Sequence, residues 1–326
     1  MAGSEVMRGC NPTGHETMRP AVYIPNFNGA TRIGRALRSL REQSRPVDVV
    51  VVDNGSSDDS LQLLHDEFPE VEVLALERNL GFGPALNRAV HEHPADPLIL
   101  LNNDAAAEPR FVEALLDAAA EGVRAVAGVL LQERDPGLID SAGVLADRTL
   151  MGFDHLHGEP LAALATAADP LGPTGGAALY DRTAFKAVGG FDERIFLYYE
   201  DLDLALRLSA AGGRCRLAPE ARAIHAYSAS LGAASGAKYA RTGWSRGYML
   251  RRYGIASHPR LALRALACES ALCAGQILRD RTAQGIAGRL RGWRDGAGLE
   301  PRETGAAPLL ELSAREALAL RRLRRG

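Results

Sequence analysis

Cysteine is scarce in this chain and has no spacing that indicates a metal site. Cys10, Cys215, Cys268 and Cys273 are its four cysteines, and no two of them form a C-x-x-C pair. Cys268 and Cys273 lie five positions apart, so on a helix they would not lie one above the other. We therefore expect reduced thiols, which are typical of a cytoplasmic protein.

Long apolar runs and an excess of one charge are also lacking. Arg, Asp or Glu interrupts each apolar run before it reaches the roughly 18 residues of a membrane span. Residues 1–19 have no signal-peptide pattern and read as a flexible leader. Lys and Arg number 38 against 40 Asp and Glu, so the composition gives no indication of a nucleic-acid partner. Because 46% of the residues are hydrophobic, a sizeable core is expected.

The charge is unevenly distributed along the chain. From Trp244 to Gly326 there are 16 basic and 7 acidic residues, whereas the remainder has 22 basic and 33 acidic ones. An acidic body therefore precedes a basic C-terminal region, which we place at 251–326. Such a region either makes a peripheral contact with an anionic surface, here the inner face of the plasma membrane, or is a solvated helical face.

The first hundred residues alternate short apolar runs with helical patterns. Strands are predicted at 21–24, 47–52, 71–76 and 97–101, and helices at 29–43, 58–68 and 84–91. This alternation predicts βαβ units and an α/β fold with parallel strands. Further strands are predicted at 124–131, 175–180, 215–218 and 223–226, and helices at 110–120, 182–188, 199–212, 239–252, 258–276 and 309–325. The stretch 132–172 reads as loop.

Acidic residues follow several of the predicted strands, where open α/β sheets bind their ligands. Asp53 follows the run VDVVVV and can accept hydrogen bonds from a nucleoside. Asp104 follows LILL and suits a hard cation such as Mg²⁺ or Mn²⁺. The segment Glu200-Asp201-Leu202-Asp203 begins a helix, and crowding of its acids can raise the pKa of one to suit a general base. Taken singly, each also has an ordinary reading as a turn or a helix cap, and His225 reads as a structural histidine.

The order of these segments resembles the family 2 glycosyltransferases, and in particular their bacterial rhamnosyltransferase and galactofuranosyltransferase-like branch. The segments are VYIPNFNG, VVDNGSSDDS, ERNLGFGPALNRAV, LILLNNDA, GPTGGAALYDRTAFKAVGGFDERIFLYYEDLDLALR and AIHAYSAS. The resemblance covers about 20–250, which we take as the catalytic domain. It implies a GT-A fold, with a Rossmann-like nucleotide-binding half and a mixed central sheet, to which a helical C-terminal extension is added.

The resemblance also implies roles for individual residues. Asp201 matches the catalytic base, with Glu200 as the fallback. Asp104 matches the metal-binding carboxylate of the DxD motif, and His225 the histidine that completes the metal shell. The positions that match the donor nucleotide-sugar site are Asn28, Asp53, Asn79, Gly81, Phe82, Asn87, Asn102, Asn103, Gly175 and Gly176. Asn102 departs from the Asp that begins a DxD motif, and Arg88 stands where a small residue is usual.

The implied reaction is an inverting, metal-dependent transfer from a nucleotide sugar, with Mg²⁺ or Mn²⁺ as cofactor. The expected donor is dTDP-rhamnose or another dTDP- or UDP-hexose, and the acceptor is a hydroxyl of a glycan, a glycolipid or a natural product. A sugar-1-phosphate nucleotidylyltransferase is an alternative, but it needs a glycine-rich loop where Pro25-Asn26-Phe27-Asn28-Gly29 follows the first strand. A non-catalytic nucleotide-sugar-binding protein is another, although it would have no need of Asp201.

Overall fold

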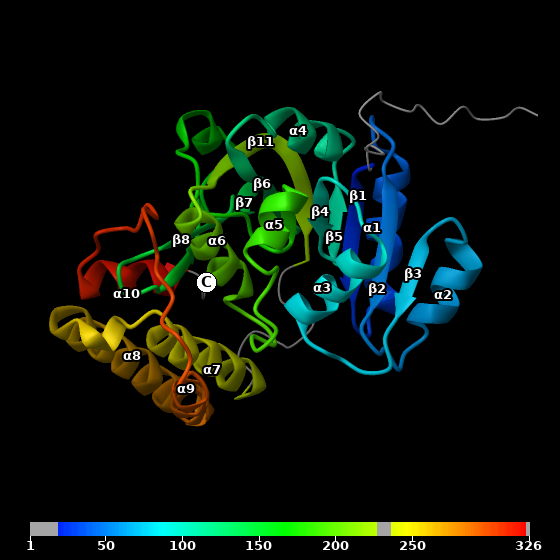
Figure 1. Ribbon diagram of the computed structural model, residues 1–326. Helices are drawn as coiled ribbons and strands as arrows, with labels where there is room; N and C mark the ends of the chain where they lie inside the picture. The colour runs from blue at the N-terminus through cyan, green and yellow to red at the C-terminus, as the bar shows by residue number, and fades with distance from the viewer. Residues whose placement is uncertain (1–18, 227–235, 324–326) are drawn as a thin grey trace, which may run out of the picture.

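The computed structural model describes residues 19–226 and 236–323, so nearly all of the predicted leader lies outside the described residues. A nine-stranded sheet passes through the molecule in the order β3-β2-β1-β4-β10-β6-β11-β5, with β7 paired to β6. Helices cover both faces of this sheet, and the last four helices gather at one end of the molecule (Figure 1).

The first four strands of the sheet are parallel to one another. They are β1 (Ala21–Asn26), β2 (Asp48–Asp53), β3 (Glu72–Ala75) and β4 (Leu98–Leu101). The strand β10 (Ala177–Tyr180) is antiparallel to β4 and to β6 (Val123–Gln132). Beyond β6 lie β11 (Arg214–His225) and the short β5 (Ala105–Ala107), while β7 (Asp135–Ser141) pairs with the other edge of β6. The sheet is therefore mixed, as predicted.

The helices pack on the sheet through two apolar layers, one on each face of the sheet. The helices of this part are α1 (Ala30–Arg41), α2 (Ser60–Glu67), α3 (Phe82–Glu92), α4 (Phe111–Ala118), α5 (Arg182–Ala187) and α6 (Glu200–Ala210). One layer contains Ile33 and Phe111, and the other contains Leu86, Phe185 and Phe191. Short 3-10 helices span Leu161–Thr166 and Ile255–Ser257.

The C-terminal region, predicted at 251–326, is helical as expected, and one of its helices packs unusually closely on the helix that precedes it. The preceding helix is α7 (Gly236–Arg252), and the region itself contains α8 (Pro259–Asp280), α9 (Gln284–Asp295) and α10 (Ala314–Leu323). A Cβ at Gly292 of α9 would overlap the backbone carbonyl of Trp244 on α7, and one at Gly247 would overlap that of Arg289. Glycines at these positions let the two backbones approach each other.

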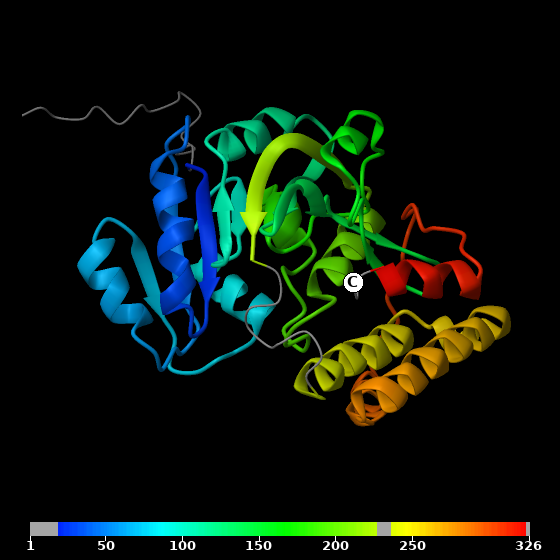
Figure 2. The same cartoon turned by 180° about the vertical axis from the view of Figure 1, so that it is seen from behind.

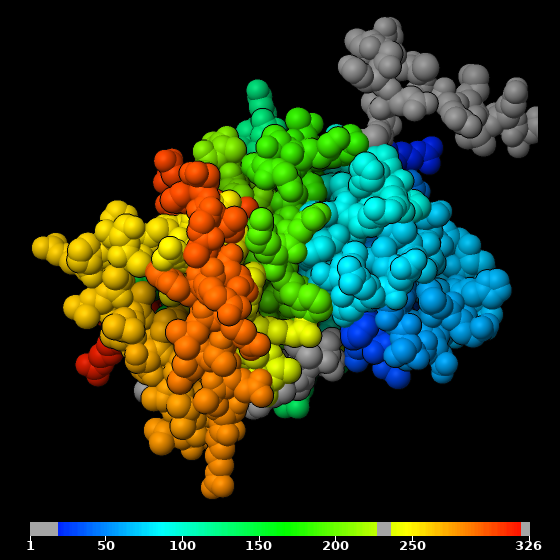
Figure 3. Space-filling model, turned by 60° about the horizontal axis from the view of Figure 1, so that its bottom comes forward, coloured from blue at the N-terminus to red at the C-terminus, as the bar shows by residue number. Residues whose placement is uncertain are grey.

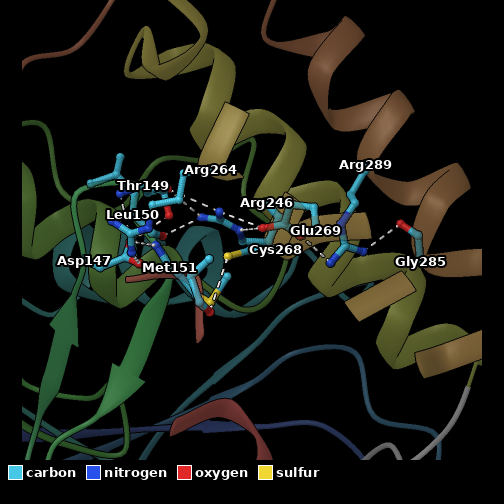
Figure 4. Close-up of polar contacts among 11 residues, drawn as sticks. Asp147, Thr149, Leu150, Met151, Arg246, Arg264, Cys268, Glu269, Gly285 and Arg289 are labelled. Carbon is cyan, nitrogen blue, oxygen red and sulfur yellow. Dashed lines mark hydrogen bonds and ion pairs between the residues drawn. The ribbon is translucent and has the colours of Figure 1, made fainter. Parts of the chain in front are cut away.

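A buried ion-pair network attaches α8 to its neighbours (Figure 4). The Glu269 carboxylate lies 2.7 Å from the Arg246 guanidinium of α7 and 2.6 Å from that of Arg289 on α9. Although burial opposes it, the charges of these two arginines lower the pKa of Glu269 to about 2. Arg246 also donates to the carbonyl oxygen of Leu150, and Arg264 pairs with Asp147. The network therefore joins three helices to the loop between β8 (Val144–Ala146) and β9 (Gly152–Asp154).

Three predictions of secondary structure were wrong. The stretch 132–172, read as loop, contains β7, β8 and β9, because its Gly and Pro residues mask short strands. The two strands predicted at 215–218 and 223–226 are one irregular strand, β11. Helix α9 was missed because glycine normally disfavours helix, whereas here its glycines are needed for contact with α7.

Helix α8 is the one described helix that by length and composition is able to cross a membrane. It has 22 residues, a window of mean hydropathy 1.4, and 28% of that window is buried in the protein. Its two internal charges, Arg264 and Glu269, are both ion-paired to other parts of the chain. The sequence pattern alone did not single out this helix as a candidate span.

Candidate active site

The ends of β1 and β2 form one side of the candidate site. Asp53 is 1% exposed, and its carboxylate accepts hydrogen bonds from the Ser56 amide (2.9 Å) and the Asn26 side chain (3.0 Å). The Asn26 amide oxygen in turn accepts a hydrogen bond of 2.7 Å from Asn103. Two of the predicted donor-site residues, Asp53 and Asn103, are thus connected through Asn26, which the motif analysis did not select.

The loop after β1 is hydrogen-bonded to the turn after β2. Asn28 has a left-handed backbone (φ 50), its side chain accepts a hydrogen bond of 2.8 Å from the Ser57 amide, and its own amide donates to the Ser56 hydroxyl at 2.9 Å. Between these contacts the Phe27 side chain is 43% exposed. An exposed aromatic ring beside two rigid turns is a surface on which a nucleoside base can stack, and only the structure reveals it.

The segment before α3, residues 79–81, packs against the loop that leads to Glu200 and Asp201. Asn54 donates to the side-chain oxygen of Asn79 (3.1 Å) and to the carbonyl oxygen of Gly81 (3.0 Å). Gly81 has φ 100, and a Cβ there would lie 2.5 Å from the Phe196 carbonyl oxygen. The residues predicted from the NxGF segment therefore lie together, held by Asn54 of the Asp53 turn.

Phe82 lies beside Gly175, the first of two adjacent glycines just before β10. A Cβ at Gly175 would lie 2.8 Å from the Phe82 ring, and one at Gly176 would lie 2.8 Å from the Asn102 amide nitrogen. The backbone amide of Asn102 donates a hydrogen bond of 3.2 Å to the Gly176 carbonyl oxygen. A larger residue at either position would therefore have to displace the Phe82 ring or the Asn102 side chain.

Asn87 is bound to the backbone on both sides of its amide group. It donates to the Phe191 carbonyl oxygen (2.9 Å) and accepts from the Phe191 amide (2.9 Å). In this structure Asn87 positions the segment that leads to α6, and any contact with a donor stays a prediction.

Strand pairing brings Asp104 and His225 together on the other side of the site. His225 lies opposite Ala105 in the β5–β11 pair, and its Nε2 is 3.2 Å from a carboxylate oxygen of Asp104. Its Nδ1 is 2.7 Å from a carboxylate oxygen of Asp140 on β7. Although burial opposes it, hydrogen bonding to the two carboxylates raises the pKa of His225 to about 9. Asp140 was not predicted, because its stretch was read as loop.

The chemistry of this group fits a divalent cation that takes part of its coordination from a ligand. In the described parts of the chain no set of three or more His, Cys, Asp and Glu residues is arranged as a complete metal site. Asp104 and His225 nevertheless converge, and Asp140 holds the other imidazole nitrogen, an arrangement common among metal-binding histidines. Diphosphate oxygens and water would supply the remaining ligands.

The acids at the start of α6 differ in their surroundings. Tyr198 and Tyr199 just before them have left-handed backbones (φ 70 and 72), a conformation that is costly for non-glycine residues and is often found at functional sites. Asp203 is fully buried and is bound by Arg207, Tyr253 and Arg302. It is therefore not available as a base.

Glu200 and Asp201 share a buried corner. The Asp201 carboxylate accepts a hydrogen bond from the Leu202 amide at 2.7 Å and another from the Gly175 amide, while burial raises its pKa. Burial and the adjacent Asp201 charge together raise the pKa of Glu200 to about 8. One Glu200 oxygen has no hydrogen-bond partner among the described residues. At neutral pH Glu200 therefore stays largely protonated beside Asp201.

Several of the predicted site residues are connected through Gly175 and Gly176. Gly175 contacts both Asp201 and Phe82, and Gly176 packs on Asn102, whose amide lies 3.5 Å from the imidazole of His225. Figure 2 shows β1 and β11 ending on the same side of the molecule, the side where α7 also lies. Asp201 and the Asp104–His225 pair, for which different roles are predicted, thus lie on either side of Gly175 and Gly176.

Comparison with known proteins shows the family to which the chain belongs. Residues 21–189 match the family described as Glycosyl transferase family 2. The N-acetylglucosaminyl-diphospho-decaprenol L-rhamnosyltransferase of Mycobacterium tuberculosis is 34% identical over 238 residues, which cover 65% of this chain and 77% of that protein.

Two solved structures share the fold at low sequence identity. A mannosyltransferase from Pyrobaculum calidifontis, in complex with GDP-Man and Mn²⁺, superposes with a TM-score of 0.51 at 18% identity, covering 86% of this chain and 87% of that one. GalNAc-T7 with UDP, GalNAc and Mn²⁺ has a TM-score of 0.57 at 15% identity, covering 87% of this chain and 55% of that one. The predicted GT-A fold is confirmed, and the chain belongs to the family 2 glycosyltransferases.

Proposed function

We propose that this glycosyltransferase is an inverting, metal-dependent rhamnosyltransferase that uses dTDP-rhamnose and a glycan acceptor linked to a polyprenyl diphosphate. The observation that supports the chemistry is the hydrogen bond between the Asp201 carboxylate and the Gly175 amide, in the turn before β10. The next residue, Gly176, packs against the Asn102 side chain, which lies beside the His225–Asp104 pair. The sugar and the acceptor class come from the mycobacterial rhamnosyltransferase, which has 34% identity to this chain.

In the proposed reaction Asp201 removes the proton from the acceptor hydroxyl. The hydroxyl oxygen forms a bond to the anomeric carbon, the bond from that carbon to the diphosphate breaks, and the electron pair leaves with the nucleotide. Attack from the face opposite the diphosphate inverts the anomeric centre. Because Glu200 is protonated at neutral pH, it keeps a second negative charge away from the base.

On the donor side, Asp104 and His225 would hold Mg²⁺ or Mn²⁺ against the diphosphate, where the cation neutralises charge on the leaving group. Asp140 fixes the His225 ring by a 2.7 Å contact to its Nδ1. Phe27, Asn28 and Asp53 form the proposed site for the nucleoside base of the donor. The rest of the donor pocket would be lined by Asn79, Gly81, Phe82, Asn102 and Asn103.

Both alternatives are less well supported. The loop 25–29 after β1 is fastened to Ser56 and Ser57, unlike the glycine-rich loop that a nucleotidylyltransferase requires. A mere nucleotide-sugar-binding protein has no use for a buried carboxylate with a raised pKa beside the donor floor. We propose a cytoplasmic location, consistent with the reduced state of Cys215, Cys268 and Cys273.

A donor panel tests the proposal. Purified protein is incubated with dTDP-rhamnose, dTDP-glucose, UDP-glucose or UDP-galactose, a synthetic N-acetylglucosaminyl-diphospho-polyprenol and Mn²⁺, and products are identified by mass. We expect a deoxyhexose addition from dTDP-rhamnose alone, lost with EDTA and in Asp201→Asn. Transfer from a UDP-hexose only would reassign the donor, and full activity in EDTA would exclude the metal role.

A further inference from the structure

We propose that the outer face of α8 and α9 is a docking surface for an anionic lipid bilayer. This docking face consists of Leu263, Leu266, Ile277, Leu278, Ile286 and Leu290 together with the arginines around them. It goes beyond the transfer reaction proposed above, and it can be measured without turnover. Figure 3 shows α8 and α9, in yellow to orange, on the outside of the molecule and away from the blue β1–β3 side.

The apolar side chains of the docking face are exposed to a degree that is unusual for a folded domain. Leu263 is 70% exposed, Leu266 65% and Leu278 80% on α8, and Leu290 is 67% exposed on α9. The positions 263, 266, 270, 274, 277 and 278 follow helical spacing, so they form one stripe. A contiguous apolar patch of this kind is typical of an interaction surface.

Between the two helices the stripe deepens into a groove. The groove has a volume of about 650 Å³ and is lined by Leu250, Ile255, Ala265, Leu266, Ile277 and Leu290, with α7 as its floor. Its polar neighbours Glu269 and Arg289 are paired with each other. Such a groove can accommodate the upper part of an acyl chain, whereas water gains little there because few polar partners face it.

Exposed arginines lie on or directly beside the same two helices. Arg260, Arg279, Arg281 and Arg291 are exposed, and within the described residues none lies within ion-pair distance of a carboxylate. Of the acids on α8 and α9, Glu269 is buried between two arginines, Asp280 accepts a hydrogen bond from Tyr239, and Asp295 pairs with Arg294. An apolar stripe with an arginine rim is complementary to anionic headgroups over acyl chains.

The same charges argue against the other occupants of this face. A second copy of the chain would bring its own arginine rim against the first, while the rest of the protein, with 33 acidic and 22 basic residues outside Trp244–Gly326, would be repelled by an anionic membrane. The charge distribution therefore orients the docking face toward the bilayer. Helix α8 lies on this surface and does not cross it, because Arg264, Cys268 and Glu269 are fixed to the folded protein (Figure 4).

Vesicle co-sedimentation of the full chain tests the proposal. We compare vesicles of phosphatidylcholine with vesicles that also contain phosphatidylglycerol, at low and high salt. Binding is expected to the anionic vesicles, with a marked decrease at high salt. The triple variant Arg260→Gln, Arg279→Gln, Arg281→Gln should bind at least about tenfold more weakly, since each arginine near an anionic surface contributes about fivefold.

The apolar contribution is tested by Leu263→Gln, Leu266→Gln, Leu278→Gln, which should also bind at least about tenfold more weakly. The matched control is Leu61→Gln on α2, 41% exposed and far from α8, which should bind normally. Vesicle binding unaffected by the leucine variant, or equal on neutral vesicles, would overturn the proposal. So would a dimer in sedimentation velocity that the leucine variant dissociates while no vesicles bind.

Discussion

At the scale of single residues, the two acids that begin α6 have different chemistry despite being adjacent. Asp201 accepts two backbone amides, which stabilise its charge, while one oxygen of Glu200 has no partner among the described residues. Asp201→Asn keeps the size of the side chain and removes the proton acceptor. We expect kcat to fall by about 10²–10⁴ with little change in donor affinity. Glu200→Gln should keep most of the turnover at pH 7, and the reverse pattern in steady-state kinetics would move the base to Glu200.

The raised pKa of Glu200 also has a consequence for stability. Its pKa is about 8 in the folded protein and near the ordinary carboxyl value in the unfolded chain, so the folded state binds the proton more tightly. The contribution of Glu200 is fully present below pH ~4.5 and is lost progressively as the pH rises through about 8. Glu200→Gln should therefore unfold in urea with a midpoint that decreases less between about pH 5 and 8 than that of the parent protein. Parallel curves for the two proteins would contradict the raised pKa.

Asp140 makes a testable contribution through His225. Asp140→Asn removes the carboxylate that holds Nδ1 of the His225 ring, so Mn²⁺ in the presence of dTDP should bind about 10–100-fold more weakly. Electron paramagnetic resonance of unbound Mn²⁺ measures this affinity without turnover. The control is Asp135→Asn, at the exposed start of the same strand, which should bind Mn²⁺ normally. Equal affinities in both variants would remove Asp140 from the metal group.

Sequence reasoning selected candidate residues that stand next to clear strand or helix patterns, and it did not select those that depend on long-range pairing. Asp104 was found because a strand of four apolar residues precedes it, and Asp201 because a helix follows it. Asp140 was missed because its strand is irregular, with exposed residues 135–137 and shifts of register against β6. Phe27 was not selected since exposure of a single aromatic is decided by tertiary packing.

At the scale of elements, the contact between α7 and α9 depends on glycines that a sequence pattern treats as helix breakers. Gly292→Ala would place a methyl group on the Trp244 carbonyl oxygen, and a backbone atom has little freedom to move away. We expect the free energy of unfolding to fall by about 3 kcal/mol or more.

A second glycine provides the control for this substitution. Gly275 lies inside α8, and a Cβ there meets nothing within 4 Å. Gly275→Ala should therefore raise the free energy of unfolding by about 0.5–1 kcal/mol through helix propensity. Urea unfolding followed by circular dichroism compares both variants. Equal effects of the two substitutions would show that α9 does not pack on α7 as described.

At the scale of the whole molecule, the C-terminal region shares a core with the part that carries the site. Val144 and Leu206 pack in one apolar cluster with Tyr248, Tyr253 and Ala265. The domain division into 20–250 and 251–326 stays a prediction, since it rested on where the family pattern ends and the basic charge begins. What the sequence could not predict is that the segment after α9 returns to α6, because that contact joins residues about a hundred positions apart.

Arg302 makes this return contact and carries the last prediction. Its guanidinium lies 2.8 Å from Asp192 and 2.6 Å from Asp203, two buried carboxylates that also bind Tyr248 and Tyr253. Arg302→Ala would remove the cation paired with Asp192 and leave Asp203 with Arg207 as its cation. We therefore expect a loss of about 3 kcal/mol in one cooperative urea transition and a lower kcat, since α6 carries Asp201. Arg294→Ala, which breaks an exposed pair, should cost less than about 1 kcal/mol. Two separate transitions, with only the C-terminal one shifted, would show that the region folds independently of the catalytic part.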